Sequence, residues 1–347
     1  AVPFASPPSL SVVLQTAGGP VRGMGIPAGV TLIIGGGYHG KSTLLHALES
    51  GHLDHIPGDG RQRVVVGPHA VKVRAEDGRR IASVDVSAFL STLPGGRSTR
   101  PLDSDDASGS TSQAASIVEA IESGAQVLLF DEDTSATNLL VRDPRMRQLV
   151  SRAHEPITPL VERIRQLYEN AGVSSILVVG GVGDALAVAD RVLCMQDYLA
   201  TDLTQEAHRV GGPRPAPPSP LPEALCRRVD RSSLAPGGKG RVRARDARVI
   251  DYGDTEIEIG AVDQITGGAQ AATLGHALRV ASSGGRGGEA VPMSVLLDGV
   301  EDLLAEHGLD ALSPHTSPIG SLVAIRRHEL AACINRLRTT RVDCEPS

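Results

Sequence analysis

The sequence predicts an α/β domain built on a mainly parallel sheet, followed by a small C-terminal α+β domain. Short apolar runs rich in β-branched residues indicate buried strands, and they alternate with segments whose apolar residues recur at helical spacing. This alternation is typical of a parallel sheet covered by helices. The predicted strands are Val30–Ile34, Val127–Phe130, Ile176–Val179 and Val192–Met195. The predicted helices begin at Lys41, cover Gln113–Ser123, and begin at Pro159 after a cap at Thr158.

Less regular segments separate these elements. Residues 1–29 are predicted to be an extended lead-in, in which Leu10–Leu14 is a candidate edge strand. Val64–Val66 and Val71–Val73 are predicted to be short strands on either side of a Gly-Pro turn. Leu93–Gly109 is rich in Gly, Ser, Asp and Pro, and is therefore predicted to be a loop.

A proline-rich stretch marks the boundary between the two domains. Residues 211–222 hold six prolines, which indicates a stiff linker or a surface excursion. We therefore expect one domain over residues 1–210, a linker over 211–236 and a small domain over 237–347. The small domain is predicted to contain a hairpin made by Arg241–Arg248 and Thr255–Ile259, and helices at Val291–His307 and His328–Leu337.

The overall composition is that of an ordinary globular protein with few aromatic residues. Of 347 residues, 41% are hydrophobic, 2% are aromatic and the formal net charge is −6. An acidic protein binds polyanions only through a local patch, and stacking platforms for single-stranded nucleic acid need more aromatic residues. The four cysteines form no CxxC pair, which argues against a zinc site or a disulfide framework. No apolar stretch approaches the roughly 18 residues of a membrane span.

The first residues carry no export signal. The segment AVPFASPPSLSVV lacks the basic and apolar regions of a signal peptide, and together with the scattered cysteines this predicts a cytoplasmic protein. The segment also lacks an initiator methionine and opens on a Pro-rich stretch, so we expect that a further region precedes it.

The strongest motif is a glycine-rich loop between the first predicted strand and helix. GGGYHGKST, Gly35–Thr43, fits the phosphate-binding pattern G-x-x-x-x-G-K-[ST]. Glycines let backbone N–H groups close around phosphate oxygens, the lysine reaches the β- and γ-phosphates, and the hydroxyl ligates Mg²⁺. The predicted ligands are ATP and Mg²⁺. The predicted contact residues are Gly35, Gly36, Gly37, Tyr38, His39, Gly40, Lys41, Ser42 and Thr43. For Tyr38 and His39, an exposed loop side chain without a ligand role is an equally open alternative.

A second motif places acidic residues at the end of a buried strand. In VLLFDED, Val127–Asp133, the strand would bring Asp131 to the sheet edge that carries the glycine-rich loop. Asp131 is then predicted to hold Mg²⁺ together with Ser42, and Glu132 to orient or deprotonate an attacking water. A solvated acidic turn is the alternative.

A third motif is the serine-rich turn ASGSTSQAA, in which Ser108, Gly109 and Ser110 introduce an alanine-rich helix. A helix N-terminus free of bulky side chains favours a bound anion. Standing alone, the turn would indicate only an N-capped helix after a loop.

Together, the three motifs resemble those of ABC ATPases. In that family the serine-glycine turn of one subunit caps the γ-phosphate held by the other subunit's glycine-rich loop. The resemblance therefore implies an ABC-type P-loop fold and a homodimer that sandwiches two ATP molecules. DEDTSATN, Asp131–Asn138, resembles the family's catalytic strand end and D-loop, with Asp133 where transporters usually carry proline.

A closer resemblance is to a non-transporter branch, the predicted ABC-class ATPases that include a protein of the kinetoplastid mitochondrial RNA-editing machinery. The similar segments run from about Gly23 to Thr339. They are GMGIPAGVTLIIGGGYHGKSTLLHALE, HIPGDGR, ASGSTSQAA, DEDTSATN and RRHELAACINRLRT.

Several positions depart from the ABC pattern. Transporters place a switch histidine after the strand ILVV, whereas this chain reads Gly180, Gly181, Val182, Gly183, Asp184. No side chain there replaces the histidine. The serine turn reads SGSTSQ rather than SGGQ, and neither Gln62 nor Asp85–Phe89 fits the family's Q-loop well. Slow turnover is the expected consequence.

Two groups of arginines are candidates for binding a nucleic-acid backbone. Arg241, Arg243 and Arg245 alternate with apolar residues, so a strand would place them on one face. A second cluster consists of Arg326, Arg327, Arg336, Arg338 and Arg341. A solvated face is the alternative for both groups, and for the first group it would lie near Asp246 and Asp251.

Two functions are consistent with these motifs. The chain is predicted to be an ATPase that drives a conformational switch, with RNA or another nucleic acid as a candidate partner and no membrane. The alternative is a nucleotide-gated binding or scaffold protein in which ATP sets the shape and hydrolysis is minor.

Overall fold

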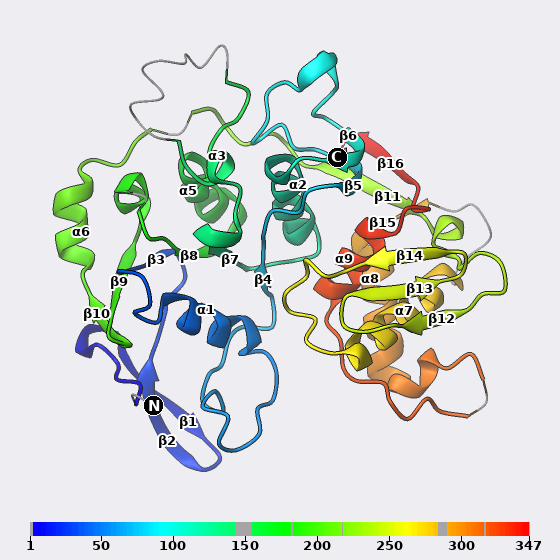
Figure 1. Cartoon of the computed structure of the whole chain (residues 1–347), viewed down its shortest axis with the longest axis horizontal. Coiled ribbons are helices and arrows are strands. Elements are labelled where there is room, and N and C mark those ends of the chain that lie inside the picture. Colours follow the sequence, from blue (N-terminus) through cyan, green and yellow to red (C-terminus); the bar gives the residue numbers. More distant parts are fainter. Residues whose placement is uncertain are drawn as a thin grey trace. The chain divides into compact units, whose positions relative to one another are not determined.

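The protein is described by a computed structural model that covers residues 3–142, 155–181, 183–216, 218–283, 290–315 and 317–346. Its chain divides into two compact units (Figure 1), and each unit combines two separate stretches. The first unit holds residues 1–70 and 126–221, and the second holds 71–125 and 222–347. No helix in the described part of the chain is both long and apolar enough to cross a membrane.

This division differs from the consecutive domains expected from the sequence. The sequence placed residues 71–125 in the domain over 1–210, whereas the structure groups them with the C-terminal residues. The reason is packing within the second unit, where helix α2 (Gly109–Glu122) and strand β5 (Arg79–Val84) both contact helix α9 (Arg327–Arg336). The proline-rich residues 211–221 belong to the first unit.

The main sheet has the strand order β10–β9–β3–β8–β7–β4; its first five strands belong to the first unit, and β4 spans the point where the chain passes from the first unit to the second. Neighbours β9, β3, β8 and β7 run parallel, and β10 is antiparallel to β9, so the prediction of a mainly parallel sheet is confirmed. The bounds are β3 (Val30–Ile34), β4 (Ala70–Lys72), β7 (Val127–Asp131), β8 (Ser174–Val178), β9 (Arg191–Gln196) and β10 (Leu199–Asp202).

Helices cover this sheet, and a hairpin precedes it. Helix α1 (Lys41–Ser50) contacts β7 and β8, while α5 (Leu160–Ala171) contacts β3 and β8. Pro159, rather than Thr158, is the N-cap of α5. The remaining elements are β1 (Ser11–Thr16), β2 (Gly19–Met24), α3 (Thr137–Leu140), α6 (Thr204–Gly211) and the 3-10 turns Pro8–Leu10, Glu132–Thr134 and Gly183–Val188.

The core of the first unit follows the two-residue alternation of its strands. Ile33 belongs to a buried cluster with Leu45 and Leu48 of α1. Leu32, the preceding residue of β3, is also fully buried and points to the opposite face. Both faces of β3 are therefore shielded from solvent, which explains its almost entirely apolar sequence.

Strand β1, Ser11–Thr16, begins one residue after the candidate edge strand and ends two residues after it, and it pairs antiparallel with β2. Val64–Val66, expected to be a strand, has no strand conformation. The N–H of Val66 donates instead to the carbonyl of Gly51 (3.1 Å), and Val65 is 78% exposed. Val64 and Val66 are half-buried against the core of the first unit, but no strand among the described residues pairs with this triplet, and it therefore forms no strand.

The second unit contains two small sheets, a hairpin and helices. The hairpin joins β5 to β6 (Leu102–Ala107). One sheet has the order β15–β11–β16, from Ala290–Pro292, Leu225–Asp230 and Val342–Pro346. The other has the order β12–β13–β14, from Val242–Ala244, Val249–Tyr252 and Thr255–Glu258. The helices are α2, α7 (Gly268–Ser283), α8 (Met293–His307) and α9, with 3-10 turns at Pro94–Gly96, Arg231–Leu234 and Leu309–Leu312.

Three features of this unit differ from the sequence predictions. Residues within the expected loop Leu93–Gly109 form strand β6, which pairs with β5 and buries Leu102 and Ala107. Its central residues are polar, so its sequence has the composition of a loop. Helix α2 begins at Gly109 rather than Gln113. Helix α7 was not predicted. Its Gly275 lies so close to the β12–β13 strands that an added Cβ would be 2.6 Å from Val242. Small residues there permit close packing but obscure the helical pattern.

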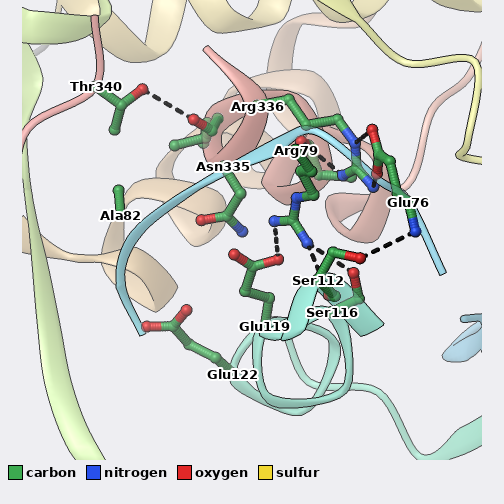
Figure 2. A network of polar contacts seen from close by, with 12 residues as sticks. Glu76, Arg79, Ala82, Ser112, Ser116, Glu119, Glu122, Asn335, Arg336 and Thr340 are labelled. Carbon is green, nitrogen blue, oxygen red and sulfur yellow. Dashed lines mark hydrogen bonds and ion pairs between the residues drawn. The ribbon is translucent and has the colours of Figure 1, made fainter. Parts of the chain in front are cut away.

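A buried network of charges ties α2 to β5 and α9 (Figure 2). Arg79 of β5 pairs with Glu119 of α2, and both side chains are almost completely buried. Arg79 Nη1 also donates to Ser116 Oγ (2.6 Å), and Arg336 of α9 pairs with Glu76 (2.7 Å). Burial lowers the pKa of the Arg79 guanidinium, and the neighbouring Glu119 carboxylate opposes that effect. The ion pair is therefore needed once Arg79 is buried.

The burial of β3 predicts a large loss of stability when one of its side chains is shortened. Leu32→Ala removes a fully buried side chain and should lower the free energy of unfolding by about 2–5 kcal/mol. Val65→Ala changes an exposed apolar residue of the same unit and should change it by less than about 0.5 kcal/mol. Urea unfolding followed by far-UV circular dichroism measures both. Similar losses for the two variants would contradict the assignment of β3 as a central strand.

The buried ion pair predicts non-additive mutations. Glu119→Leu leaves Arg79 buried without its partner and should cost about 3–5 kcal/mol of stability. The double variant Arg79→Met/Glu119→Leu removes both charges and should be more stable than Glu119→Leu alone, as measured by urea unfolding. A double variant that is less stable than Glu119→Leu would contradict the pairing.

Candidate functional site

The glycine-rich loop connects the end of β3 to the start of α1 (Figure 1). Its lysine folds back on the loop, because Lys41 Nζ donates to the carbonyl oxygens of Gly35 (2.9 Å) and Gly36 (2.7 Å). Ser42 and Thr43 follow in the first turn of α1. The strand–loop–helix context that a phosphate-binding loop requires is therefore present.

Two glycines of this loop are required by backbone conformation and packing. Gly35 (φ +140°) and Gly40 (φ +95°) lie in the left-handed region. A Cβ on Gly35 would lie 2.3 Å from the carbonyl oxygen of Met195, and one on Gly40 would lie 2.7 Å from the Tyr198 ring. Gly37 has neither constraint, since its φ is not positive and nothing lies within 4 Å of a Cβ.

The turn between β9 and β10 braces the glycine-rich loop. Asp197 (φ 50°) and Tyr198 (φ 64°) are both left-handed, as in a type I′ hairpin. The N–H of Asp197 donates to His39 Nδ1 (2.9 Å), and that of Tyr198 donates to the His39 carbonyl (3.1 Å). This contact was not predicted, because Asp-Tyr lacks the glycine that usually signals such a turn.

The side chains of Tyr38 and His39, for each of which the sequence left two roles open, differ in position. The His39 ring is held by Asp197, whereas Tyr38 is 100% exposed on the loop surface. Gly36 and Gly37 are exposed as well. The exposed part of the loop is thus its tip, with Tyr38 as the large side chain there.

The parallel register brings Asp131 to the same sheet edge as the glycine-rich loop. Ile33 of β3 and Asp131 of β7 are both in register with Val178 of β8, which lies between them. Strands two positions apart are separated by roughly 10 Å. Asp131 is 5% exposed and is the N-cap of the 3-10 turn Glu132–Thr134. The carboxyl ends of β3 and β7 are level, as the sequence predicted.

The Glu132 carboxylate is held by the backbone of the turn that follows β8. Its Oε2 accepts hydrogen bonds from the N–H groups of Gly180 (2.5 Å) and Gly181 (3.4 Å). Asp133 is exposed, and its N–H donates to Asp131 Oδ1 (3.3 Å). Of the three adjacent acids, Asp131 is buried, Glu132 is hydrogen-bonded to the backbone and Asp133 faces solvent.

The donor set at this edge fits Mg²⁺ with a nucleotide phosphate. Ser42 and Asp131 offer a hydroxyl and a carboxylate, the hard oxygen ligands that Mg²⁺ prefers. They lie on α1 and β7, which contact each other. Asp131 is buried, and the hydrogen bond found for its carboxylate within the described residues is the long one from Asp133. A buried anion with so few donors favours a bound cation.

The serine-rich turn belongs to the second unit, whereas the glycine-rich loop belongs to the first. Ser108 is the exposed N-cap of α2, and Gly109 and Ser110 begin the helix. The Gly109 N–H donates to Asp77 Oδ1 (2.6 Å). The helix N-terminus thus binds an internal carboxylate, a partner that no sequence motif indicated.

The candidate arginines are largely accompanied by acids. Arg241, Arg243 and Arg245 are exposed as expected, but Arg245 pairs with Asp251 (2.7 Å) and with Glu256. Four members of the second cluster form ion pairs within the second unit: Arg326 with Glu329, Arg327 with Asp298 and Glu301, Arg336 with Glu76, and Arg341 with Asp230. The positive patch is therefore weaker than the arginine count indicated.

Comparison with known proteins identifies the family. The family model of the ABC_ATPase P-loop domain matches residues 1–227. The chain belongs to this family. Residues 241–343 match the MRB1590 C-terminal domain, so both predicted resemblances are confirmed. Membership of the ABC_ATPase family indicates nucleotide binding, and the matched residues include the Gly35–Thr43 segment described above.

Two curated proteins share part of this ABC_ATPase sequence. The uncharacterized protein MJ1628 of Methanocaldococcus jannaschii is 33% identical over 217 residues, covering 60% of this chain and 47% of its own length. The aliphatic sulfonates import ATP-binding protein SsuB of Rhodopseudomonas palustris is 29% identical over 204 residues, covering 51% of this chain and 66% of its own. The match thus spans about half of MJ1628 and about two thirds of SsuB.

Solved ABC structures are also similar, at low identity. CbiO1 of Clostridium perfringens, part of the ABC transporter complex CbiONQ, is 18% identical with a TM-score of 0.34, covering 54% of this chain and 83% of its own. MJ1267, an ATP-binding cassette of an ABC transporter in its ADP conformation, is 14% identical with a TM-score of 0.36, covering 58% and 92%.

The ABC_ATPase loop predicts different outcomes for two of its glycines. Gly40→Ala forces a left-handed φ and a clash with Tyr198, which should cost about 1–3 kcal/mol of stability and weaken ATP binding. Gly37→Ala meets neither obstacle and should leave the melting temperature within about 1 °C of wild type. Thermal unfolding and titration with a fluorescent ATP analogue measure the two effects. Equal melting temperatures would contradict the bracing of Gly40 by the β9–β10 turn.

Proposed function

We propose that this chain hydrolyses Mg-ATP slowly and uses the cycle to switch its conformation. The observation that carries this proposal is the register at Val178, which levels the glycine-rich loop after β3 with the acidic end of β7. A phosphate cradle and two carboxylates at one sheet edge are the parts that P-loop hydrolysis requires.

Each residue of this edge has a distinct role in the proposal. Backbone N–H groups of Gly35–Thr43 bind the phosphates, and Lys41 moves from the loop carbonyls to the β- and γ-phosphate oxygens. Ser42 and Asp131 would hold Mg²⁺, and the bound ion would supply charge neutralisation for the phosphate oxygens. Glu132 accepts a proton from the attacking water as the water oxygen bonds to the γ-phosphorus. The bond to the β–γ bridging oxygen breaks, and ADP and phosphate leave.

A homodimer would complete the site. The glycine-rich loop of one copy would face the turn Ser108–Ser110 of the other, where the α2 N-terminus favours an anion. In each copy Asp77 now accepts the Gly109 N–H. The γ-phosphate of the partner's ATP would take the place of Asp77 as the acceptor, so closing would depend on ATP. Closing and opening would then move an attached partner.

A nucleotide-gated scaffold is the second candidate. The observation that favours it is the sequence of the turn after β8, which has no histidine in residues 180–184. In this case ATP would close the dimer without being consumed, and Glu132 would be a structural acceptor of the Gly180 and Gly181 N–H groups.

Nucleic acid is a candidate partner through two exposed arginines, one in strand β12 and one directly before it. Arg241 and Arg243 are exposed and form no ion pair with the described residues, and the C-terminal domain matches that of MRB1590. Such a small stripe would provide weak, salt-sensitive backbone contacts. RNA is therefore added as a ligand in the ATP hydrolysis assay described next.

ATP hydrolysis by wild type and by Glu132→Gln tests the proposed enzyme. The variant loses the proton acceptor and should be slower by about 10²–10⁴-fold while retaining ATP. Asp133→Asn makes the same charge change at the exposed neighbour and should stay near the wild-type rate. Steady-state phosphate release, with and without added RNA, is the measurement. Equal low rates for wild type and Glu132→Gln, together with tight ATP binding, would leave the scaffold.

A further inference from the structure

The turn after β8 makes a specific contact with the proposed general base. Strand β8 ends at Val178, and the next residues lead to Gly180 and Gly181. The N–H groups of these two glycines both point to one oxygen, Glu132 Oε2, at 2.5 and 3.4 Å. Oε1 of the same carboxylate accepts no hydrogen bond from the described residues. The carboxylate thus has one bound and one open oxygen.

This asymmetry suits a base that must be aimed. Hydrogen bonds from N–H groups to a carboxylate are charge-assisted and restrict its rotation. The open oxygen remains available to accept a proton from water. A second carboxylate oxygen bound in the same way would compete with that water. The contact therefore orients Glu132 without occupying the oxygen that the reaction uses.

We infer that the backbone N–H groups of Gly180 and Gly181 are the positioning groups for Glu132, at the place where ABC transporters carry a histidine. This inference rests on the proposed function, since it assigns the group that orients its general base. Because the donors belong to the backbone, the chain needs no particular side chain at these positions. The turn can therefore position Glu132 without a histidine.

The local geometry allows a side chain at either glycine without crowding. Gly180 and Gly181 are not among the residues with positive φ. A Cβ on Gly180 would lie 3.6 Å from Glu132 Oε2, an ordinary contact, and one on Gly181 would meet nothing within 4 Å. Alanine at position 180 therefore fits and keeps its N–H, whereas proline removes it. The two substitutions separate the hydrogen bond from the loss of glycine.

Gly180→Pro should lower kcat by about 10- to 100-fold, the effect expected from losing a charge-assisted hydrogen bond. Gly180→Ala should stay within about 2-fold of wild type, and the affinity for ATP should be unchanged in both. In the Glu132→Gln background, Gly180→Pro should have no further effect, because the group that it positions is gone. A rate loss that persists undiminished in that background, or equal rates for Gly180→Pro and Gly180→Ala, would overturn the inference.

A measurement that needs no hydrolysis tests the same contact. Labelling valine carbonyl carbons with ¹³C and glycine nitrogens with ¹⁵N selects Val-Gly pairs by NMR, and Val179–Gly180 is one of them. In wild type the Gly180 proton should be shifted downfield and exchange slowly. Glu132→Ala should move it upfield and speed its exchange, whereas Asp133→Ala should not.

The two experiments distinguish the failure of the inference from the failure of the proposed function. Equal hydrolysis by wild type and Glu132→Gln would reject the general base, and with it the role of the turn in positioning a base. A Gly180 signal indifferent to Glu132→Ala would reject the contact alone, whatever the rate of hydrolysis.

Discussion

The candidate functional site of this protein depends on the parallel pairing of β3 and β7 with β8. Val178 is the shared partner of Ile33 and Asp131, so the ends of two strands far apart in sequence are fixed at one level. Strand β3 leads into the glycine-rich loop, and β7 leads into the acidic turn. A shift of register by one residue would turn every side chain of the strand to the other face and misplace both motifs.

The parts predicted from the sequence are those in which residue type and backbone geometry agree. Val30–Ile34 is apolar throughout because both of its faces are covered, and Gly35 and Gly40 are glycines because their φ values and neighbours require it. Prediction was wrong where the stabilising partner is distant in sequence. Strand β6 is polar and is a strand because β5 pairs with it, and α7 is rich in small residues because it packs closely on β12 and β13.

The contacts that sequence reasoning missed at the candidate sites are mostly made by the backbone. The Gly109 N–H binds Asp77, the Gly180 and Gly181 N–H groups bind Glu132, and those of Asp197 and Tyr198 bind His39. A backbone donor requires no characteristic residue type in the sequence. The sequence motif therefore showed that a histidine is absent after β8, but not that backbone N–H groups bind Glu132 there. The P-loop motif was informative because its backbone geometry demands glycine.

The alternation of the chain between its two units has a consequence for protein synthesis. The central strand β3 (residues 30–34) leaves the ribosome well before its neighbours β8 and β9, which follow at residues 174–178 and 191–196. Residues 71–125 likewise precede their partner helix α9 by some two hundred positions. Domains encoded one after another can fold in turn during translation. Here the first unit must wait for β8 and β9, and the second must wait for helix α9 and strand β16. Neither unit can be cut out as one continuous fragment.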